Sequence, residues 1–408
     1  MATSLWKQKN FMLLWSGQLV SWVGSEVTSI ALPLVVLALT GSPAQAGNVA
    51  AIRGLVYVFW AIPAGALVDR WNIKTVMVVS NLGSGLAMGG IALALGLHGL
   101  NLPALYVACA IEGSFFVFAN LARFASLPRA VTTEQYPAAS AQMEAASQAA
   151  ILVGPPLGGF LFQLAGGFAT FLADSVSYLV NAASIFFVSS SLSAETTAER
   201  KALHKDIREA LAWYRRATVI RFLNLMTAGR IGVEAGLYLL VVVLAKEQHA
   251  SSVAIGLIFT TAAIGGVAGS WAAPRIHSRY SLKQLLAGVS LLSLLVFCLY
   301  PLAASVYALG LITALYYAVD PLFHVTTSSY SARVIPDTLR ARVVSFTRLQ
   351  VLAANSLGFF LVGQSLTHAG SRDTTFLFIG VLCALFVLIV ANARLSLTEA
   401  SAAPTRTR

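Results

Sequence analysis

Long apolar stretches dominate this chain of 408 residues, and short polar breaks rich in glycine and proline separate them. Twelve of these stretches have about the 20 residues that an α-helix needs to cross a bilayer. Their predicted bounds are 11–39, 47–68, 75–97, 102–125, 138–164, 168–191, 219–245, 252–273, 281–300, 304–328, 342–366 and 373–394. The strict polar–apolar alternation of a membrane β-barrel is lacking. The pattern therefore predicts an all-α integral membrane protein with twelve transmembrane helices.

The second half of the sequence resembles the first. A shift of 204 residues places Gly65 on Gly269, Gly154 on Gly358, Gly159 on Gly363 and Gly166 on Gly370. Such a parallel repeat predicts two pseudo-symmetric six-helix halves, 1–191 and 219–394. Between them, 192–218 is predicted to be a cytoplasmic linker with an amphipathic helix, which either lies on the membrane surface or simply joins the halves. Residues 395–408 form a short basic tail.

The basic excess of the chain is a topology signal. Lys and Arg number 27 against 16 Asp and Glu. The termini and the loops after the even-numbered stretches hold 23 of the 27, whereas the opposite loops hold only Lys246 and Arg372. Because positive residues gather on the cytoplasmic side, both termini are predicted to be cytoplasmic. This arrangement explains the charge without a nucleic-acid partner.

Motifs for metal or catalytic chemistry are lacking in the sequence. The six histidines include no HExxH pair, and Cys109, Cys298 and Cys383 lie singly in apolar stretches, where we expect three buried thiols. No nucleophile–base constellation and no Walker glycine loop occurs. We therefore expect a monomer that is not an enzyme and has no metal or cofactor, with the lipid bilayer, a small-molecule substrate and protons as its partners.

Ionisable residues inside the apolar stretches are functional candidates, because each charged Arg, Lys or Asp costs about 2.5–3.5 kcal/mol to insert. Glu26 and Glu112 have no opposite charge within one helical turn, and burial favours the protonated form of a carboxylate. They are predicted to carry protons, in that order, with Asp174 third. Arg53 is the leading counter-charge for Glu26 or for an anionic substrate.

The second half holds two charged pairs with helical spacing. Arg230 and Glu234 lie four residues apart, which favours a local ion pair. Asp320 and His324 have the same spacing across Pro321, so they form either a pH-sensitive pair or a polar packing contact. These residues are further candidates for substrate or counter-charge contacts. Two aromatic residues, Trp22 and Tyr238, are predicted to contact an amphipathic substrate.

Two motifs resemble those of a known transporter family. The loop from Gly65 through Asp69 and Arg70 to Lys74 resembles the G-x-L-x-D-R-x-x-x-[KR] signature of the major facilitator superfamily. The segment Gly154-Pro155-Pro156-Leu157-Gly158-Gly159 is similar to the GPxxGG motif of the exporters in that superfamily. The N-terminal stretch looks like the branch with macrolide-efflux proteins and the enterobactin exporter. One departure is Cys109, which stands where family drug exporters often place an arginine four residues before a glycine, here Gly113.

The resemblance implies a secondary active transporter in a bacterial cytoplasmic (inner) membrane, with proton-coupled efflux of a drug, antibiotic or siderophore by alternating access. A flippase or exporter of lysolipid or siderophore, and a non-transporting membrane receptor or scaffold on the same fold, remain as alternatives. Fold alone does not fix the direction of transport. In the loop signature, Asp69 is expected to latch the halves, while Arg70 and Lys74 pair with carboxylates or lipid phosphates. The glycines of the helix-5 motif are expected to allow close packing, and Pro155 a bend.

Overall fold

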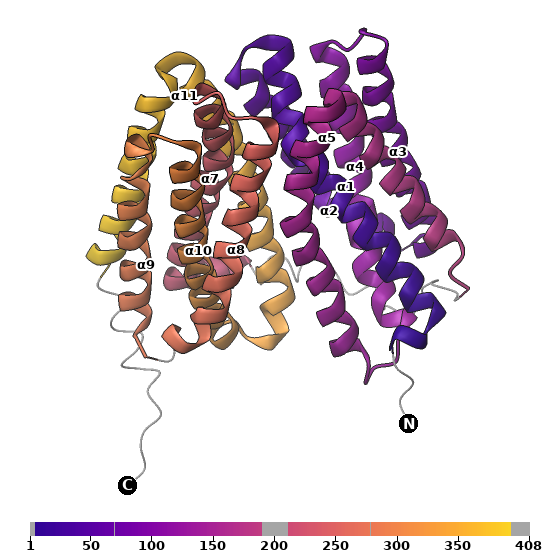
Figure 1. The fold of residues 1–408 in the computed structure, drawn as a ribbon. Helices are drawn as coiled ribbons and strands as arrows, with labels where there is room; N and C mark the ends of the chain where they lie inside the picture. The colour runs from indigo at the N-terminus through magenta and orange to yellow at the C-terminus, as the bar shows by residue number, and fades with distance from the viewer. Residues whose placement is uncertain (1–4, 69, 190–210, 278, 393–408) are drawn as a thin grey trace. The chain divides into compact units, whose positions relative to one another are not determined.

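The computed structural model describes residues 5–68, 70–189, 211–277 and 279–392, and all regular secondary structure in this part of the chain is helical (Figure 1). Short 3-10 helices lie at η1 (Leu5–Lys7) and η2 (Tyr300–Leu302). The long helices are α1 (Lys9–Thr40), α2 (Pro43–Val68), α3 (Ile73–Gly96), α4 (Leu102–Ala130), α5 (Tyr136–Phe186), α7 (Thr218–Glu247), α8 (Ser252–His277), α9 (Leu282–Phe297), α10 (Val306–Val334) and α11 (Asp337–Ala391).

Two of these ten helices each contain two spans. The 51-residue α5 bends at Ala165 and Gly166, and the 55-residue α11 bends at Gly370. Both glycines have positive φ, 62° and 78°, a conformation that favours glycine. With each bend separating two helices, the described residues form twelve, so the prediction of a twelve-helix, all-α membrane fold is confirmed.

The repeat extends to residues that shape the backbone. Gly166 and Gly370 are 204 residues apart, and so are Thr170 and Thr374. The Thr170 hydroxyl donates to the carbonyls of Gly166 (3.5 Å) and Gly167 (2.8 Å), and the Thr374 hydroxyl donates to that of Gly370 (2.7 Å). The same shift relates Asn101 and Ser305, which cap α4 and α10 by accepting from the backbone N–H three residues later. Equivalent turns and helix starts therefore use equivalent positions.

The chain divides into two compact units, Met1–Ala198 with His249–Thr260 and Glu199–Gln248 with Thr261–Arg408. In the first unit, α1 packs along α5, while α3 packs against α4 and α5. In the second unit, α7 packs against α11, and α9 packs against α10 and α11. The start of α8 belongs to the first unit and the remainder to the second. Each unit thus has its own packed interior, in which its charged residues are placed.

The outer surface of the helices is apolar. Nine helices of the described residues are long and apolar enough to cross a membrane. Large apolar side chains are widely exposed, including Phe59 (71%) and Leu86 (73%). A surface of this kind suits lipid. Cys298 and Cys383 are also exposed, so the expectation of three buried thiols was wrong for these two and holds for Cys109.

Most of the predicted linker lies outside the described residues. Its end, 211–216, is helical. Tyr214, near the end of the predicted linker, packs against a cluster containing Ile220 and Val343. Its hydroxyl donates to Gln350 of α11 at 3.1 Å. The end of the linker therefore packs on the second unit.

Candidate functional site

An ion pair lies inside the first unit, between α2 and α4. The guanidinium of Arg53 donates to the Glu112 carboxylate (Nη2–Oε1, 2.8 Å), and the hydroxyl of Tyr178 on α5 donates to the same oxygen (2.8 Å). The Glu112 side chain is only 3% exposed and that of Arg53 is 32% exposed. The Phe116 ring, 5.1 Å from the guanidinium carbon, covers the cation. The structure therefore pairs Arg53 with Glu112, whereas the sequence suggested Glu26.

A second buried carboxylate, Asp174 of α5, lies in the same cluster. Thr28 of α1 donates to its Oδ2 (2.7 Å), and Ser177 lies 3.3 Å from its Oδ1. Asp174 is 1% exposed and forms no ion pair within the described residues. The side chains of Asp174, Glu112 and Arg53 line one small cavity of about 10 Å³. That volume suits about one water molecule rather than an organic substrate.

Glycines bring α1 and α5 close together beside this cluster. A Cβ at Gly24 would lie 2.9 Å from the Asp174 carboxylate, and a Cβ at Gly154 would overlap the side chain of Glu26. At Gly158 it would lie 2.6 Å from the carbonyl oxygen of Val27. The segment is thus a close-packing surface for the helix that carries Glu26.

The other residues of the helix-5 motif share this buried environment. Pro155 and Gly159 are buried like Gly154 and Gly158, and the backbone at Pro155 is helical, so the bend expected there lies instead at Ala165 and Gly166. Glu26 itself is half-buried on α1 and has no ion pair within 4 Å among the described residues. The structure therefore joins the helix-5 motif to the α1 carboxylate.

The structure describes the loop signature between α2 and α3 except for Asp69. The prediction that Asp69 latches the halves therefore concerns a residue outside the described part of the chain. Lys74 donates to the Val188 carbonyl (2.7 Å) after α5 and lies 5.5 Å from the ring centre of Phe186. It thus holds the end of a helix of its own unit, a contact that the sequence did not suggest. Arg70 is exposed, and a Cβ on Gly65 would meet no described atom within 4 Å.

A larger cavity of about 330 Å³ lies elsewhere in the first unit. Trp22, Arg123, Tyr136 and Glu144 are among its lining residues. The Arg123 guanidinium lies 5.2 Å from the Trp22 ring centre and 4.1 Å from that of Phe124. This volume is in the range of small-molecule sites, and the lining is both aromatic and charged.

Sequence reasoning assigned Arg123 to topology alone and missed its place at this cavity. The predicted span ended at 125, but α4 continues to Ala130. A longer helix places Arg123 more than one turn from its end. The aromatic residue next to it, Phe124, was the signal that could have identified it.

The second unit has its own buried ion pair, between α7 and α10. Arg230 donates to Asp320 (Nη2–Oδ1, 2.6 Å) and to Ser293 of α9 (3.2 Å). The Phe323 ring lies 4.7 Å from its guanidinium carbon. The prediction of a local Arg230–Glu234 pair was therefore wrong, because the carboxylate that pairs with Arg230 comes from another helix. A direct, charge-assisted hydrogen bond to a carboxylate stabilises a buried arginine more than a carboxylate that the guanidinium does not contact.

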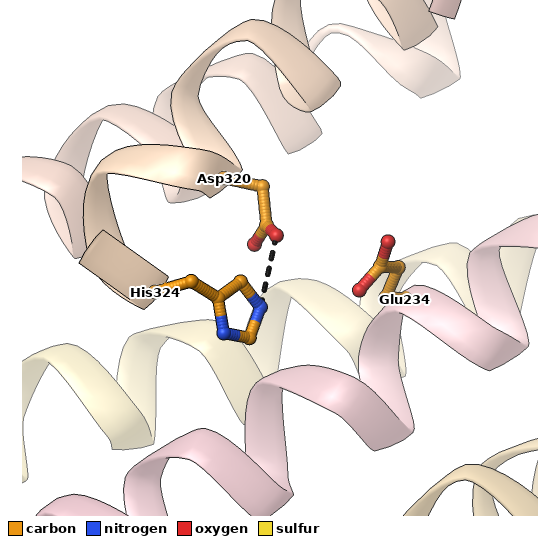
Figure 2. Close-up of side chains that lie close together, drawn as sticks. All are labelled: Glu234, Asp320 and His324. Carbon is orange, nitrogen blue, oxygen red and sulfur yellow. Dashed lines mark ion pairs between the residues drawn. The ribbon is translucent and has the colours of Figure 1, made fainter. Parts of the chain in front are cut away.

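Glu234 joins a group of possible metal ligands at the same place. Asp320 Oδ2 lies 3.2 Å from His324 Nε2, and one oxygen of Glu234 completes a set of ligand atoms that all lie within 4.8 Å of one another. Figure 2 shows the side chains of Glu234, Asp320 and His324 turned toward one another. Tyr238, one turn beyond Glu234, packs edge-on against Phe359.

The comparisons with known proteins agree with this architecture. The family model for the Major Facilitator Superfamily matches residues 14–319. The multidrug efflux pump Tap of Mycobacterium tuberculosis is 26% identical over 382 residues, which cover 90% of this chain and 89% of the pump. Tap of Mycolicibacterium fortuitum is 24% identical over 387 residues, covering 90% and 92%.

Solved transporter structures share the fold. The nucleoside transporter NupG matches with a TM-score of 0.74 and 15% identity, covering 94% of this chain and 98% of its own. A bacterial homologue of the human lysosomal transporter Spinster matches with a TM-score of 0.75 and 14% identity, covering 96% of each chain. At these identities the likeness concerns the arrangement of helices and says nothing of substrate.

Proposed function

Because the chain belongs to the Major Facilitator Superfamily, we propose that it exports amphipathic organic compounds from bacterial cells in exchange for protons, by alternating access. The membrane is the cytoplasmic membrane, and both termini face the cytoplasm. The multidrug efflux pumps that match 90% of the chain support export and a broad substrate class. The coupling to protons rests on the chain's own residues.

The observation that carries the proposal is the buried charge cluster of the first unit, defined by Arg53, Glu112, Asp174 and Tyr178. Each charged residue at the centre of a bilayer costs about 2.5–3.5 kcal/mol, so a purely structural bundle gains little from keeping three of them. Arg53 balances one of the two carboxylates through a direct 2.8 Å contact. The cluster therefore holds one carboxylate in excess of its cations.

The contacts suggest a division of roles between the carboxylates. Glu112 is held by Arg53 and Tyr178, so its negative charge is compensated. Asp174 contacts the neutral hydroxyls of Thr28 and Ser177. A hydroxyl can donate to an ionised carboxylate and, after rotation, accept from a protonated one, so these contacts are compatible with both protonation states of Asp174. Asp174 and Glu26 are accordingly the proton carriers in this proposal, and Arg53 stabilises Glu112.

A substrate would bind in the 330 Å³ cavity of the same unit. The Trp22 ring and the Arg123 guanidinium supply an apolar face beside a positive charge, and Glu144 supplies a negative one. This combination fits a molecule with both apolar and charged parts. The Gly65–Lys74 loop is proposed to gate access, with Lys74 fixed on the Val188 carbonyl as its anchor.

The test uses inverted membrane vesicles energised so that protons are pumped inward, with a pH-sensitive dye. Lipophilic cations, macrolides and siderophores are added in turn, and dequenching reports proton release. Wild type should release protons with at least one compound, and Glu26→Gln or Asp174→Asn should abolish this release. Glu134→Gln, an exposed carboxylate before α5, is the matched control and should behave as wild type.

Two results would separate this proposal from its alternatives. If labelled compounds bind to wild type but none moves protons, a receptor or uncoupled carrier replaces the exporter. If both carboxylate variants retain coupling at wild-type protein levels, the charge cluster is structural. A response confined to siderophores or lysolipids would narrow the substrate class instead.

A further inference from the structure

Three side chains with metal-binding atoms converge in the second unit. Glu234 comes from α7, and Asp320 and His324 come from successive turns of α10 (Figure 2). One ligand atom of each lies within 4.8 Å of the other two. The proposed exchange of protons in the first unit makes no use of this group.

The distances suit a metal ion after a small side-chain movement. Zn²⁺ bonds to nitrogen and oxygen are about 2.0–2.2 Å long, so neighbouring ligand atoms on one ion lie about 3.0–3.5 Å apart. Asp320 Oδ2 and His324 Nε2 already have this spacing, 3.2 Å. The longer separations, up to 4.8 Å, involve a half-buried glutamate whose side chain can turn toward the other two.

The ligand types select a class of ion. An imidazole nitrogen with two carboxylate oxygens suits Mn²⁺, Fe²⁺, Co²⁺ or Zn²⁺. Ca²⁺ and Mg²⁺ prefer oxygen ligands alone, and Cu⁺ prefers sulfur. The His324 side chain is 38% exposed, which leaves a path for the ion to enter.

The surroundings provide supporting contacts of the kind found around metal ligands. Arg230 and His324 contact different oxygens of Asp320, so Arg230 can orient this carboxylate while Oδ2 faces the imidazole. The arginine is itself held by Ser293. With Arg230 positive and both carboxylates negative, the group has one negative charge in excess when His324 is neutral, which favours a cation.

A second observation points to a ligand at this place. Tyr316 lies one turn before Asp320 on α10 and is fully buried. Its hydroxyl oxygen has no hydrogen-bond partner in the described part of the chain. A buried hydroxyl without a partner calls for a water or an ion that completes its bonding. A water molecule on a bound metal would supply that partner.

We propose that Glu234, Asp320 and His324 bind one divalent transition-metal ion, which links α7 to α10. The ion takes one oxygen from each carboxylate and Nε2 from the imidazole. Water completes its coordination. The site is a binding function beyond the proposed export of organic compounds, and it stands or falls independently of proton coupling.

The experiment is a titration of the purified full-length protein, free of any affinity tag, with Co²⁺ in detergent. The visible d–d absorption of Co²⁺ reports inner-shell nitrogen and oxygen ligands, and displacement by Zn²⁺ reports competition. The test variants are His324→Gln and Glu234→Gln, which keep polar side chains of similar size. Asp320 is left unchanged because its loss would leave Arg230 buried without its carboxylate.

The matched controls remove the same chemical groups elsewhere in this unit. His368→Gln changes an exposed histidine of α11, and Glu247→Gln changes an exposed glutamate at the end of α7. Wild type should bind one Co²⁺ per chain, each test variant should raise the Kd about tenfold or more, and the controls should not change it. Thermal unfolding of each variant without metal verifies its fold.

Two results would overturn the proposal. One is the absence of saturable Co²⁺ binding by wild type. The other is wild-type affinity in a folded His324→Gln protein, which would place the ion elsewhere. Neither result bears on the vesicle assay of proton release, so the metal site and the exporter can fail separately.

Discussion

At Gly158, α5 lies directly against the backbone of α1, and an added methyl group tests this contact. In Gly158→Ala the new Cβ would lie 2.6 Å from the Val27 carbonyl oxygen and 3.0 Å from its Cα. Both are backbone atoms, so no side-chain rotation relieves the overlap. Ordinary contact begins at 3.4 Å. The two helices must therefore separate by up to about 0.8 Å, the difference between these distances.

The expected cost follows from this displacement and from a suitable reference. Overpacking of this kind costs about 1–3 kcal/mol, whereas alanine gains about 1 kcal/mol over glycine inside a helix. Gly90→Ala on α3 isolates the second effect, because a Cβ at Gly90 meets no described atom within 4 Å. Gly158→Ala should therefore be about 1–3 kcal/mol less stable than Gly90→Ala.

The assay is unfolding by SDS in mixed micelles, followed by far-UV circular dichroism on both variants and wild type. Transport in vesicles should fall in Gly158→Ala as well, because α1 carries Glu26 and Thr28. Equal stability of the two alanine variants would refute the close contact. Normal stability with lost transport would instead mean that the helices separate at little cost and that the motif acts on the carboxylates.

Three further predictions concern an ion pair, a backbone hydrogen bond and two glycine turns. Arg53→Gln should destabilise the protein by roughly 1–3 kcal/mol in the same assay, because Glu112 is left buried without its cation, and adding Glu112→Gln should restore most of the loss. Lys74→Met should cost about 0.5–1.5 kcal/mol through its lost backbone hydrogen bond, and transport in vesicles should fall because Lys74 anchors the proposed gating loop. Gly166→Ala and Gly370→Ala should each cost about 1–3 kcal/mol, since both need a backbone conformation that alanine rarely adopts, and similar shifts in SDS unfolding would support the equivalence of the two turns.

Sequence reasoning predicted the helices well because their signals are local. An apolar run of bilayer length is sufficient to predict a span. The predicted breaks between spans, at 164–168 and 366–373, contain Gly166 and Gly370, where the long helices α5 and α11 bend. These features depend on residues that are close together in the chain.

The charge partners were predicted poorly because they are distant in the chain. Arg53 and Glu112 are 59 residues apart, and Arg230 and Asp320 are 90 apart. Helical spacing identifies neighbours on one helix only, and it favoured Glu234 as the partner of Arg230. The choice between a local and a distant carboxylate depends on how helices pack, which one sequence does not show.

The two halves share their backbone plan but not their chemistry. The 204-residue shift superposes the bending glycines, their threonines and the capping residues Asn101 and Ser305. In the same shift, Glu26 is equivalent to Arg230 and Glu112 to Tyr316. Two carboxylates of the first half thus correspond to a guanidinium and a phenol in the second. Turns and caps have the same physical requirement in both halves, because each chain reversal must satisfy the same backbone groups. Charged sites have no such requirement, and this difference is what allows the two halves to differ as proposed, with proton exchange in one and a cation site in the other.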